Sequence, residues 1–209
     1  MSTLDTLLAQ RLVPVVVIDD AAAAAPLAES LVDGGLPVAE VTFRTAAAPE
    51  ALREMSRHED LLVGAGTVLC VDQARMAVDC GARFIVSPGY SSELVAFGRE
   101  GGVPVLPGVA TATDVMRALA DGVELVKFFP AEAMGGVATV KALSAPFPQV
   151  RFVPTGGVAE RNLADYLAVP SVAAVGGSWM VPKKLMATHD WPAVTDLVRS
   201  AVAAVAQAR

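Results

Sequence analysis

The chain has 209 residues, of which 54% are hydrophobic and 18% are charged, with a formal net charge of −6 and a pI near 4.9. This length predicts one domain over residues 1–209, and the acidic balance argues against nucleic acid or an anionic membrane as a partner. No apolar run reaches the roughly 18 residues of a membrane span. A small anionic ligand is compatible with this composition, because a single site can be positive on an acidic protein.

The N-terminal residues lack the basic start and the long apolar segment of a secretory signal peptide. Cys70 and Cys80 are the only cysteines, and they do not form a CxxC pair. We expect both to be reduced thiols rather than a disulfide. The sequence therefore predicts a cytoplasmic protein.

Short apolar runs alternate with longer alanine-rich runs along the whole chain. A short helix is expected at 4–10, and the alanine run at 21–25 begins a helix with Asp19 or Asp20 as its N-cap. Strands are expected at 12–18, 38–43, 61–67, 84–88, 103–109, 123–129, 150–155 and 172–176. Further helices are expected at 46–57, 71–80, 92–100, 112–121, 160–167 and 191–206.

The strand starts lie roughly 19 to 27 residues apart, which is the length of a βα unit with short loops. Glycines follow several of the expected helices, as C-cap glycines do. These are Gly34, Gly35, Gly81, Gly101, Gly102 and Gly122. The repeated units predict an α/β protein, a single-domain (β/α)8 TIM barrel with an extra N-terminal helix. An open, doubly wound sheet is the alternative.

Lys127 lies in the apolar, β-prone segment 123–130, which reads as the end of a buried parallel strand. An ammonium group there loses hydration unless a partner or a reaction requires it. Burial favours the neutral amine, which attacks carbonyl groups. The alternative is a lysine that leaves the strand end and reaches solvent.

The second strand carries Glu40, Thr42 and Arg44 at alternate positions, which places them on one face. We expect that face to be the barrel interior or its rim. A buried Glu40 needs a cation nearby, which Lys127 or Arg44 can supply. A structural pair of Glu40 and Arg44 within the strand is the alternative.

Other strand ends supply candidates for the walls of a pocket. The third strand ends at Gly66 and Thr67, and its glycines do not form a dinucleotide fingerprint because Leu69 occupies the third glycine position. Gly64 and Gly66 are expected to keep the barrel mouth open, with the Thr67 hydroxyl facing into it. Pro88 lies in a rigid turn after the fourth strand, which either walls a pocket or simply ends the strand.

The last two strands end in Thr155-Gly156-Gly157 and in Gly176-Gly177-Ser178. In barrels of this class, backbone N–H groups of these two loops commonly bind phosphate. Glycines allow close approach of an anion, and Ser178 adds a hydroxyl donor. Simple turns are the alternative. The two histidines, His58 and His189, lie away from the strand ends, so no histidine-rich metal site is expected.

These strand-end motifs resemble those of the 2-keto-3-deoxy-6-phosphogluconate (KDPG) aldolase family of class I pyruvate aldolases. The motifs are Glu40-Val-Thr-Phe-Arg44-Thr45, Gly64-Ala-Gly-Thr67, Ser87-Pro-Gly89, Pro107-Gly-Val-Ala-Thr111, Lys127-Phe-Phe-Pro-Ala-Glu132, Thr155-Gly-Gly157 and Gly176-Gly-Ser-Trp179. The resemblance runs in order over nearly the whole chain. It implies a barrel that assembles as a homotrimer, needs no metal or other cofactor, and acts in the Entner–Doudoroff route.

The resemblance also implies roles for individual residues. Lys127 forms the Schiff base, and Glu40 transfers protons. Arg44 and Thr67 hold the pyruvyl carboxylate, and Phe129 packs beside the substrate. The glycines and Ser178 of the last two loops bind the phosphate. Met134 departs from the smaller or polar residue expected in its loop, which can alter the pocket rim.

The reaction expected from this resemblance is cleavage of 2-dehydro-3-deoxy-6-phosphogluconate to pyruvate and glyceraldehyde 3-phosphate. Relatives that act on the galactonate epimer tend to lack the Arg-Thr pair at Arg44, which favours the gluconate substrate. Aldol cleavage of 4-hydroxy-2-oxoglutarate is the alternative within catalysis. A barrel that only binds a sugar phosphate is the alternative outside it.

Overall fold

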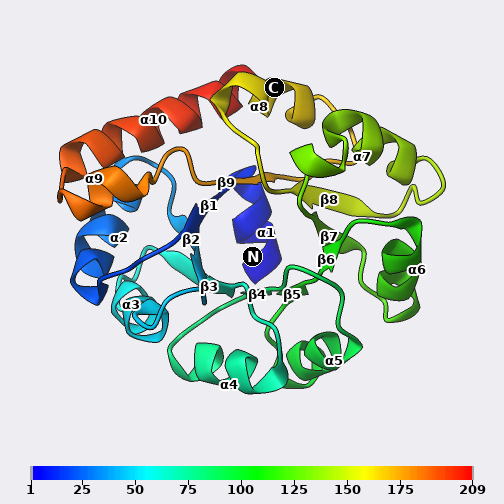
Figure 1. The fold of residues 1–209 in the computed structure, drawn as a ribbon, viewed down its shortest axis with the longest axis horizontal. Helices are drawn as coiled ribbons and strands as arrows, with labels where there is room; N and C mark the ends of the chain where they lie inside the picture. Colours follow the sequence, from blue (N-terminus) through cyan, green and yellow to red (C-terminus); the bar gives the residue numbers. More distant parts are fainter. Residues whose placement is uncertain (1, 209) are drawn as a thin grey trace.

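The computed structural model describes residues 2–208. The strands lie around the middle of Figure 1 with the helices outside them, which makes an α/β domain with a curled parallel sheet. The strands are β1 (Leu12–Val16), β2 (Val38–Thr42), β3 (Leu62–Gly66), β4 (Ile85–Val86), β5 (Val105–Leu106), β6 (Gly108–Val109), β7 (Leu125–Phe128), β8 (Arg151–Pro154) and β9 (Val175–Gly177).

The strands pair in two groups, one in the order β5-β4-β3-β2-β1-β9 and the other in the order β6-β7-β8. Isolated parallel bridges join Phe152 to Val172 and Thr155 to Gly176, so the end of β8 lies beside β9. β5 and β6 flank Pro107, which has no N–H to offer a neighbouring strand. The run at 103–109, expected as one strand, is therefore divided into two short strands.

The helices largely follow the expected pattern, and α1 lies across the middle of the ring of strands in Figure 1. They are α1 (Thr3–Ala9), η1 (Ala21–Ala23), α2 (Ala24–Asp33), α3 (Ala48–Met55), α4 (Val71–Asp79), α5 (Ser92–Gly101), α6 (Ala112–Ala120), η2 (Glu132–Met134), α7 (Gly136–Ser144), α8 (Glu160–Leu167), α9 (Lys183–Ala187) and α10 (Trp191–Gln207). The sequence pattern singled out neither α7 nor α9. Asp20 caps η1, because its side chain accepts a hydrogen bond from the backbone N–H of Ala22.

The core lies on and between the strands and helices. β1, β2 and β9 are buried at every residue, as parallel strands covered on both faces are. Few polar side chains share this interior. The buried polar or charged residues are Ser30, Glu40, Thr42, Ser87, Lys127 and Thr155. All except Ser30 lie on a strand or directly after one, so the polar part of the interior gathers near the strand ends. Within residues 2–208, no helix is both long and apolar enough to cross a membrane.

Candidate active site

Lys127 of β7 and Glu40 of β2 form a buried ion pair. The Lys127 Nζ donates to Glu40 Oε1 at 3.0 Å, and the two side chains are 5% and 3% exposed. β2 and β7 lie on opposite sides of the centre in Figure 1, so the side chains meet in the interior of the ring. The alternative of a lysine that reaches solvent is therefore wrong.

Burial of this ion pair carries a large desolvation penalty, because each charge loses hydration and would strongly destabilise the fold if it were unpaired. The Lys127 ammonium also lies 5.5 Å from the centre of the Phe129 ring, within the range of a cation–π interaction. Glu40 has room because Gly66 of β3 lacks a side chain: a β-carbon there would stand 2.1 Å from Glu40 Oε1. Gly66 thus makes space for the carboxylate, a more specific role than keeping the mouth open.

Arg44 and Thr67 meet at the rim, just beyond β2 and β3. Arg44 is exposed, and its Nε donates to Thr67 Oγ1 at 3.1 Å. Glu40 pairs with Lys127 and not with Arg44, so the alternative of an ion pair within β2 is wrong. Thr67 has a φ of 56°, in the left-handed region that residues other than glycine rarely adopt. Such backbone strain is concentrated at functional sites.

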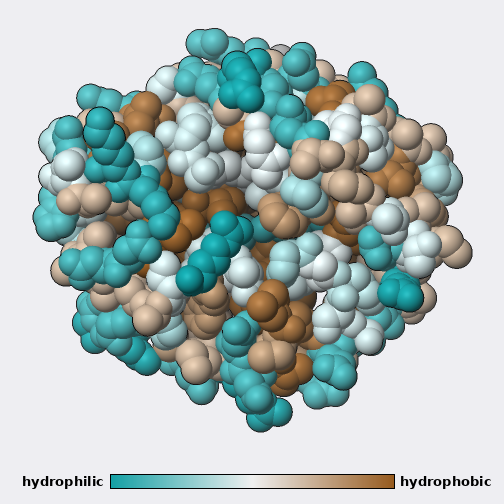
Figure 2. Space-filling view, in the orientation of Figure 1, coloured by the Kyte–Doolittle hydropathy of each residue, from teal (hydrophilic) through white to brown (hydrophobic). Residues whose placement is uncertain are grey.

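Phe129 and Pro88 line other parts of the same end of the strands. The Phe129 ring would lie 3.3 Å from a β-carbon on Gly156, so it stands between Lys127 and the turn after β8. Pro88 is half-buried after β4, and its carbonyl oxygen would lie 2.2 Å from a β-carbon on Gly108. The backbones after β4 and within β6 therefore approach closely at this wall. Figure 2, in the orientation of Figure 1, shows a recess near the middle of the face with hydrophobic atoms in its depth.

The loops after β8 and β9 are adjacent, because Thr155 bridges to Gly176. Gly156 and Gly157 have φ values of 99° and 81°, which favour glycine, and Ser178 is exposed. A β-carbon on Gly177 would stand 1.9 Å from the Trp179 ring, so this glycine makes room for the indole. The structure thus brings the two glycine-containing loops to one rim.

Position 157 requires glycine for a second reason, which the sequence pattern does not show. A β-carbon there would lie 2.6 Å from Cβ and Cγ of Glu132, on the loop after β7. Glu132 in turn accepts a hydrogen bond from the buried Tyr166 hydroxyl, 34 positions away in the chain. In the sequence, Glu132 stands out only as the last residue of the motif that begins at Lys127. No local pattern relates it to Tyr166.

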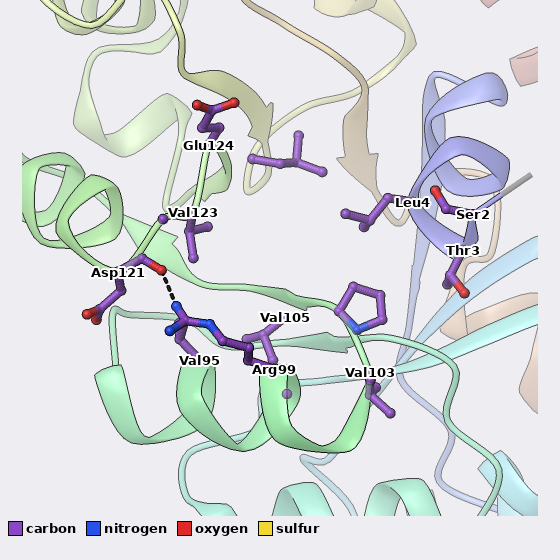
Figure 3. A pocket seen from close by; sticks show the side chains of 15 residues that line it. Ser2, Thr3, Leu4, Val95, Arg99, Val103, Val105, Asp121, Val123 and Glu124 are labelled. Atoms are coloured by element: carbon purple, nitrogen blue, oxygen red, sulfur yellow. Dashed lines mark hydrogen bonds between the residues drawn. The ribbon is translucent and has the colours of Figure 1, made fainter.

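A separate cavity of about 540 Å³ lies at the opposite ends of β5 and β7, beside α1. Figure 3 shows Arg99 there, donating to the backbone carbonyl of Asp121. The cavity is distant from the residues described above, because it lies where these strands begin rather than where they end. Neither histidine lies at the candidate site: His58 follows α3, and His189 stacks on Trp191.

A buried lysine paired with a carboxylate, at the end of parallel strands and beside an anion-compatible rim, suits covalent chemistry on a carbonyl compound. The class that this fold and site define is the class I, Schiff-base aldolases. The candidate site residues come from six separate strand ends, those of β2, β3, β4, β7, β8 and β9, which is how barrel-like folds build their sites.

The chain belongs to the KDPG and KHG aldolase family, whose model matches residues 4–197. It is 50% identical over 188 residues, 90% of each chain, to 2-dehydro-3-deoxy-phosphogluconate aldolase of Treponema pallidum. It is 47% identical over 208 residues to the enzyme of that name from Pseudomonas aeruginosa, covering 99% of this chain and 94% of the relative. The resemblance predicted from the strand-end motifs is confirmed.

A solved structure gives the same picture. The KDPG aldolase of Legionella pneumophila, with pyruvate captured at low pH as a covalent carbinolamine, superposes with a TM-score of 0.91. The two chains are 43% identical, and the match covers 96% of this chain and 98% of that one.

Proposed function

We propose that this protein is a class I aldolase that cleaves 2-dehydro-3-deoxy-6-phosphogluconate to pyruvate and glyceraldehyde 3-phosphate. The observation that carries the proposal is the buried contact of Lys127 Nζ with Glu40 Oε1, at 3.0 Å, in a chain of this family. A buried ion pair of this kind is rarely kept for stability alone. Here it supplies an amine nucleophile and a proton acceptor within hydrogen-bond distance of each other.

The mechanism follows from that contact. Glu40 takes a proton from the Lys127 ammonium, and the amine attacks the C2 carbonyl of the substrate. Glu40 returns its proton to the carbinolamine hydroxyl, which leaves as water, so an iminium ion forms and Glu40 is again a carboxylate. The iminium ion accepts the electron pair of the C3–C4 bond as the C4 hydroxyl loses its proton. Glu40 accepts that proton, directly or through a water, and returns a proton to C3 of the enamine. Hydrolysis then frees pyruvate and restores the amine.

The rim residues would hold the two ends of the substrate. Arg44 offers a planar fork suited to the pyruvyl carboxylate, and Thr67, its hydrogen-bond partner, lies beside that position. Pro88 and Phe129 would wall the carbon chain. The phosphate would lie against the adjacent loops after β8 and β9. The residues assigned to that rim are Thr155, Gly156, Gly157, Gly177 and Ser178.

The proposal extends to the fold. We infer that β5 and β6 are one strand interrupted at Pro107, and that the strands close into a single (β/α)8 barrel over residues 1–209. The support is the pair of bridges that set β8 beside β9, together with the Lys127 N–H bond to the Pro107 carbonyl at 3.0 Å. A closed ring explains how side chains of β2 and β7 meet.

We also propose a homotrimer that acts in the Entner–Doudoroff route in the cytoplasm. The support for assembly is a set of exposed apolar side chains near α4 and α6. Leu69, Met76 and Met116 are 62%, 48% and 61% exposed. Sedimentation equilibrium tests this assignment, and a Met76→Glu variant tests whether the patch takes part. A monomer at micromolar concentration would reject the trimer.

The experiment that tests the activity is reduction with borohydride in the presence of pyruvate. One stable pyruvyl group is expected on Lys127, and Lys141, Lys183 and Lys184 serve as internal controls because they are exposed. A protein that only binds sugar phosphates would form no adduct. Kinetics on the gluconate substrate, its C4 epimer and 4-hydroxy-2-oxoglutarate then separate the alternatives within catalysis.

A further inference from the structure

Glu132 lies on the loop that follows Lys127 and contacts the turn that follows β8. Its backbone N–H donates to the carbonyl of Gly156 at 3.0 Å, and the N–H of Ala131 donates to the carbonyl of Thr155 at 2.8 Å. The Cβ and Cγ of Glu132 stand 2.6 Å from the place of a β-carbon on Gly157. The Glu132 side chain therefore fills the space beside this glycine.

The Glu132 carboxylate is held by Tyr166 of α8, whose hydroxyl donates to Oε1 at 2.5 Å. Oε1 also faces Gly136, at the start of α7, where a β-carbon would stand 2.9 Å from it and 3.3 Å from the Tyr166 hydroxyl. α7 and α8 are neighbouring helices in Figure 1. One side chain thus joins the loop of Lys127, the turn after β8 and these two helices.

Tyr166 is fixed as the donor of this contact. Its ring is fully buried in the core, so the hydroxyl cannot turn to solvent. A buried tyrosine hydroxyl needs a partner, and Glu132 is the one it has. Burial, with the hydrogen bond to Glu132, raises the pKa of Tyr166 well above its ordinary value, so the hydroxyl keeps its proton.

We propose that Tyr166 and Glu132 are positioning residues for the phosphate-binding rim. The Tyr166 hydroxyl turns the Glu132 carboxylate toward Gly136 and α8, so that the side chain supports the turn at Gly157 without presenting its charge to the phosphate. This inference rests on the proposed function, because it needs a phosphate at that rim.

The physical reason is repulsion between like charges. Glu132 Cγ is one bond from its carboxylate and only 2.6 Å from the place of a β-carbon on Gly157. A carboxylate released from Tyr166 can swing toward the turn by rotation about the Cβ–Cγ bond of Glu132. A negative side chain beside a phosphate weakens its binding through repulsion and lost hydration. The Glu132 side chain supports the turn at Gly157, but its negative charge would repel the phosphate. The Tyr166 hydroxyl therefore holds that charge away from the phosphate.

The test compares Tyr166→Phe, Glu132→Gln and the double variant with the parent enzyme. The chain provides a matched control, because its other tyrosine, Tyr90, also donates its hydroxyl to a carboxylate, that of Asp121, between α5 and α6. Tyr90→Phe therefore removes the same kind of bond away from the rim. For each protein, kcat and KM are measured on the six-carbon phosphate substrate and on 4-hydroxy-2-oxoglutarate, together with borohydride trapping of pyruvate.

We expect Tyr166→Phe to raise KM for the phosphorylated substrate about tenfold, which corresponds to about 1.4 kcal/mol. Its KM for 4-hydroxy-2-oxoglutarate and its pyruvate trapping stay at the parent values, because neither involves a phosphate. Glu132→Gln keeps an oxygen that accepts from Tyr166 and stays close to the parent. The double variant recovers most of the lost KM, because the released amide is uncharged. Tyr90→Phe matches the parent throughout.

The inference is overturned if Tyr166→Phe leaves KM unchanged, if it raises KM equally for both substrates, or if the double variant shows no recovery. A parent enzyme that traps no pyruvate would instead overturn the proposed function. If Tyr166→Phe does not fold, Glu132→Asp provides the same test, because the shorter side chain withdraws from Tyr166 and leaves α8 intact. It is expected to raise KM for the phosphorylated substrate alone.

Discussion

The carboxylate of Glu40 lies over the α-carbon of Gly66, on the neighbouring strand. A β-carbon at Gly66 would stand 2.1 Å from Glu40 Oε1, 2.6 Å from Cγ and 2.7 Å from Cδ. The two residues are in parallel strands, where Glu40 itself is aligned with Gly64. The position of the carboxylate opposite Lys127 therefore depends on a glycine.

Replacing that glycine should move Glu40 and impair the chemistry. We expect Gly66→Ala to destabilise the fold by about 1–3 kcal/mol, the usual cost of overpacking a core. It should also slow proton exchange at the pyruvate methyl group. Gly101→Ala is the control, because nothing lies within 4 Å of a β-carbon there and its φ is not positive. Thermal unfolding and NMR-detected exchange measure both effects, and normal exchange in Gly66→Ala would show that Glu40 is not displaced.

The ion pair itself makes a prediction about stability. Lys127→Met leaves Glu40 buried without its partner, and breaking a buried pair in this way costs about 3–5 kcal/mol. The double variant Lys127→Met with Glu40→Gln should recover much of that loss, since no charge is left buried. Denaturant unfolding measures the difference, and neither variant should trap pyruvate. Equal stability of the single and double variants would mean that water reaches Glu40.

Much of this site was predictable because parallel strands bring their ends together. Lys127 and Glu40 are 87 positions apart, yet both were identified as charged residues in apolar strands. The apolar run at 103–109 predicts one strand, but it contains two prolines, Pro104 and Pro107, and Pro107 divides it into two short strands. The contacts of Glu40 with Gly66 and of Glu132 with Tyr166 depend on side-chain packing between separate elements, which no local pattern encodes.

Arg44 provides a prediction about the carboxylate end of the substrate. The guanidinium fork fits a carboxylate through two parallel bonds, and lysine cannot reproduce that geometry. Arg44→Lys should therefore weaken pyruvate binding by about 1.5–3 kcal/mol, the range for hydrogen bonds to charged groups. Because Arg44 is exposed, the melting temperature should change little. Calorimetry measures pyruvate binding and thermal unfolding measures the melting temperature, with Arg57→Lys as a control at an exposed arginine. A lower melting temperature with unchanged pyruvate binding would show that Arg44 stabilises the fold and does not bind the carboxylate.

The two tyrosines predict the response to alkaline pH. Burial, followed by hydrogen bonds to Asp121 and Glu132, raises the pKa values of Tyr90 and Tyr166 well above the ordinary value near 10. A raised folded pKa gives stability that is complete below the unfolded pKa and is lost as pH rises through the folded one. Phenolate absorbance should therefore stay low at about pH 10 and rise together with loss of helical circular dichroism. Phenolate formation in a protein that is still folded would contradict this.

Ser178 offers the cleanest test of the phosphate rim. A substitution at Gly157 is a poor test of phosphate binding, because any side chain there is strained at its φ of 81° and collides with Glu132. Such a variant would lose stability and phosphate binding at the same time. Ser178 is exposed, so a substitution there need not disturb the packing around it. Ser178→Ala removes one donor among several backbone N–H groups and should cost only about 1 kcal/mol of phosphate binding. Ser178→Asp adds a negative charge and should raise KM for the phosphorylated substrate far more than for 4-hydroxy-2-oxoglutarate. Steady-state kinetics on both substrates measure this difference. Equal losses on the two substrates would place the phosphate elsewhere.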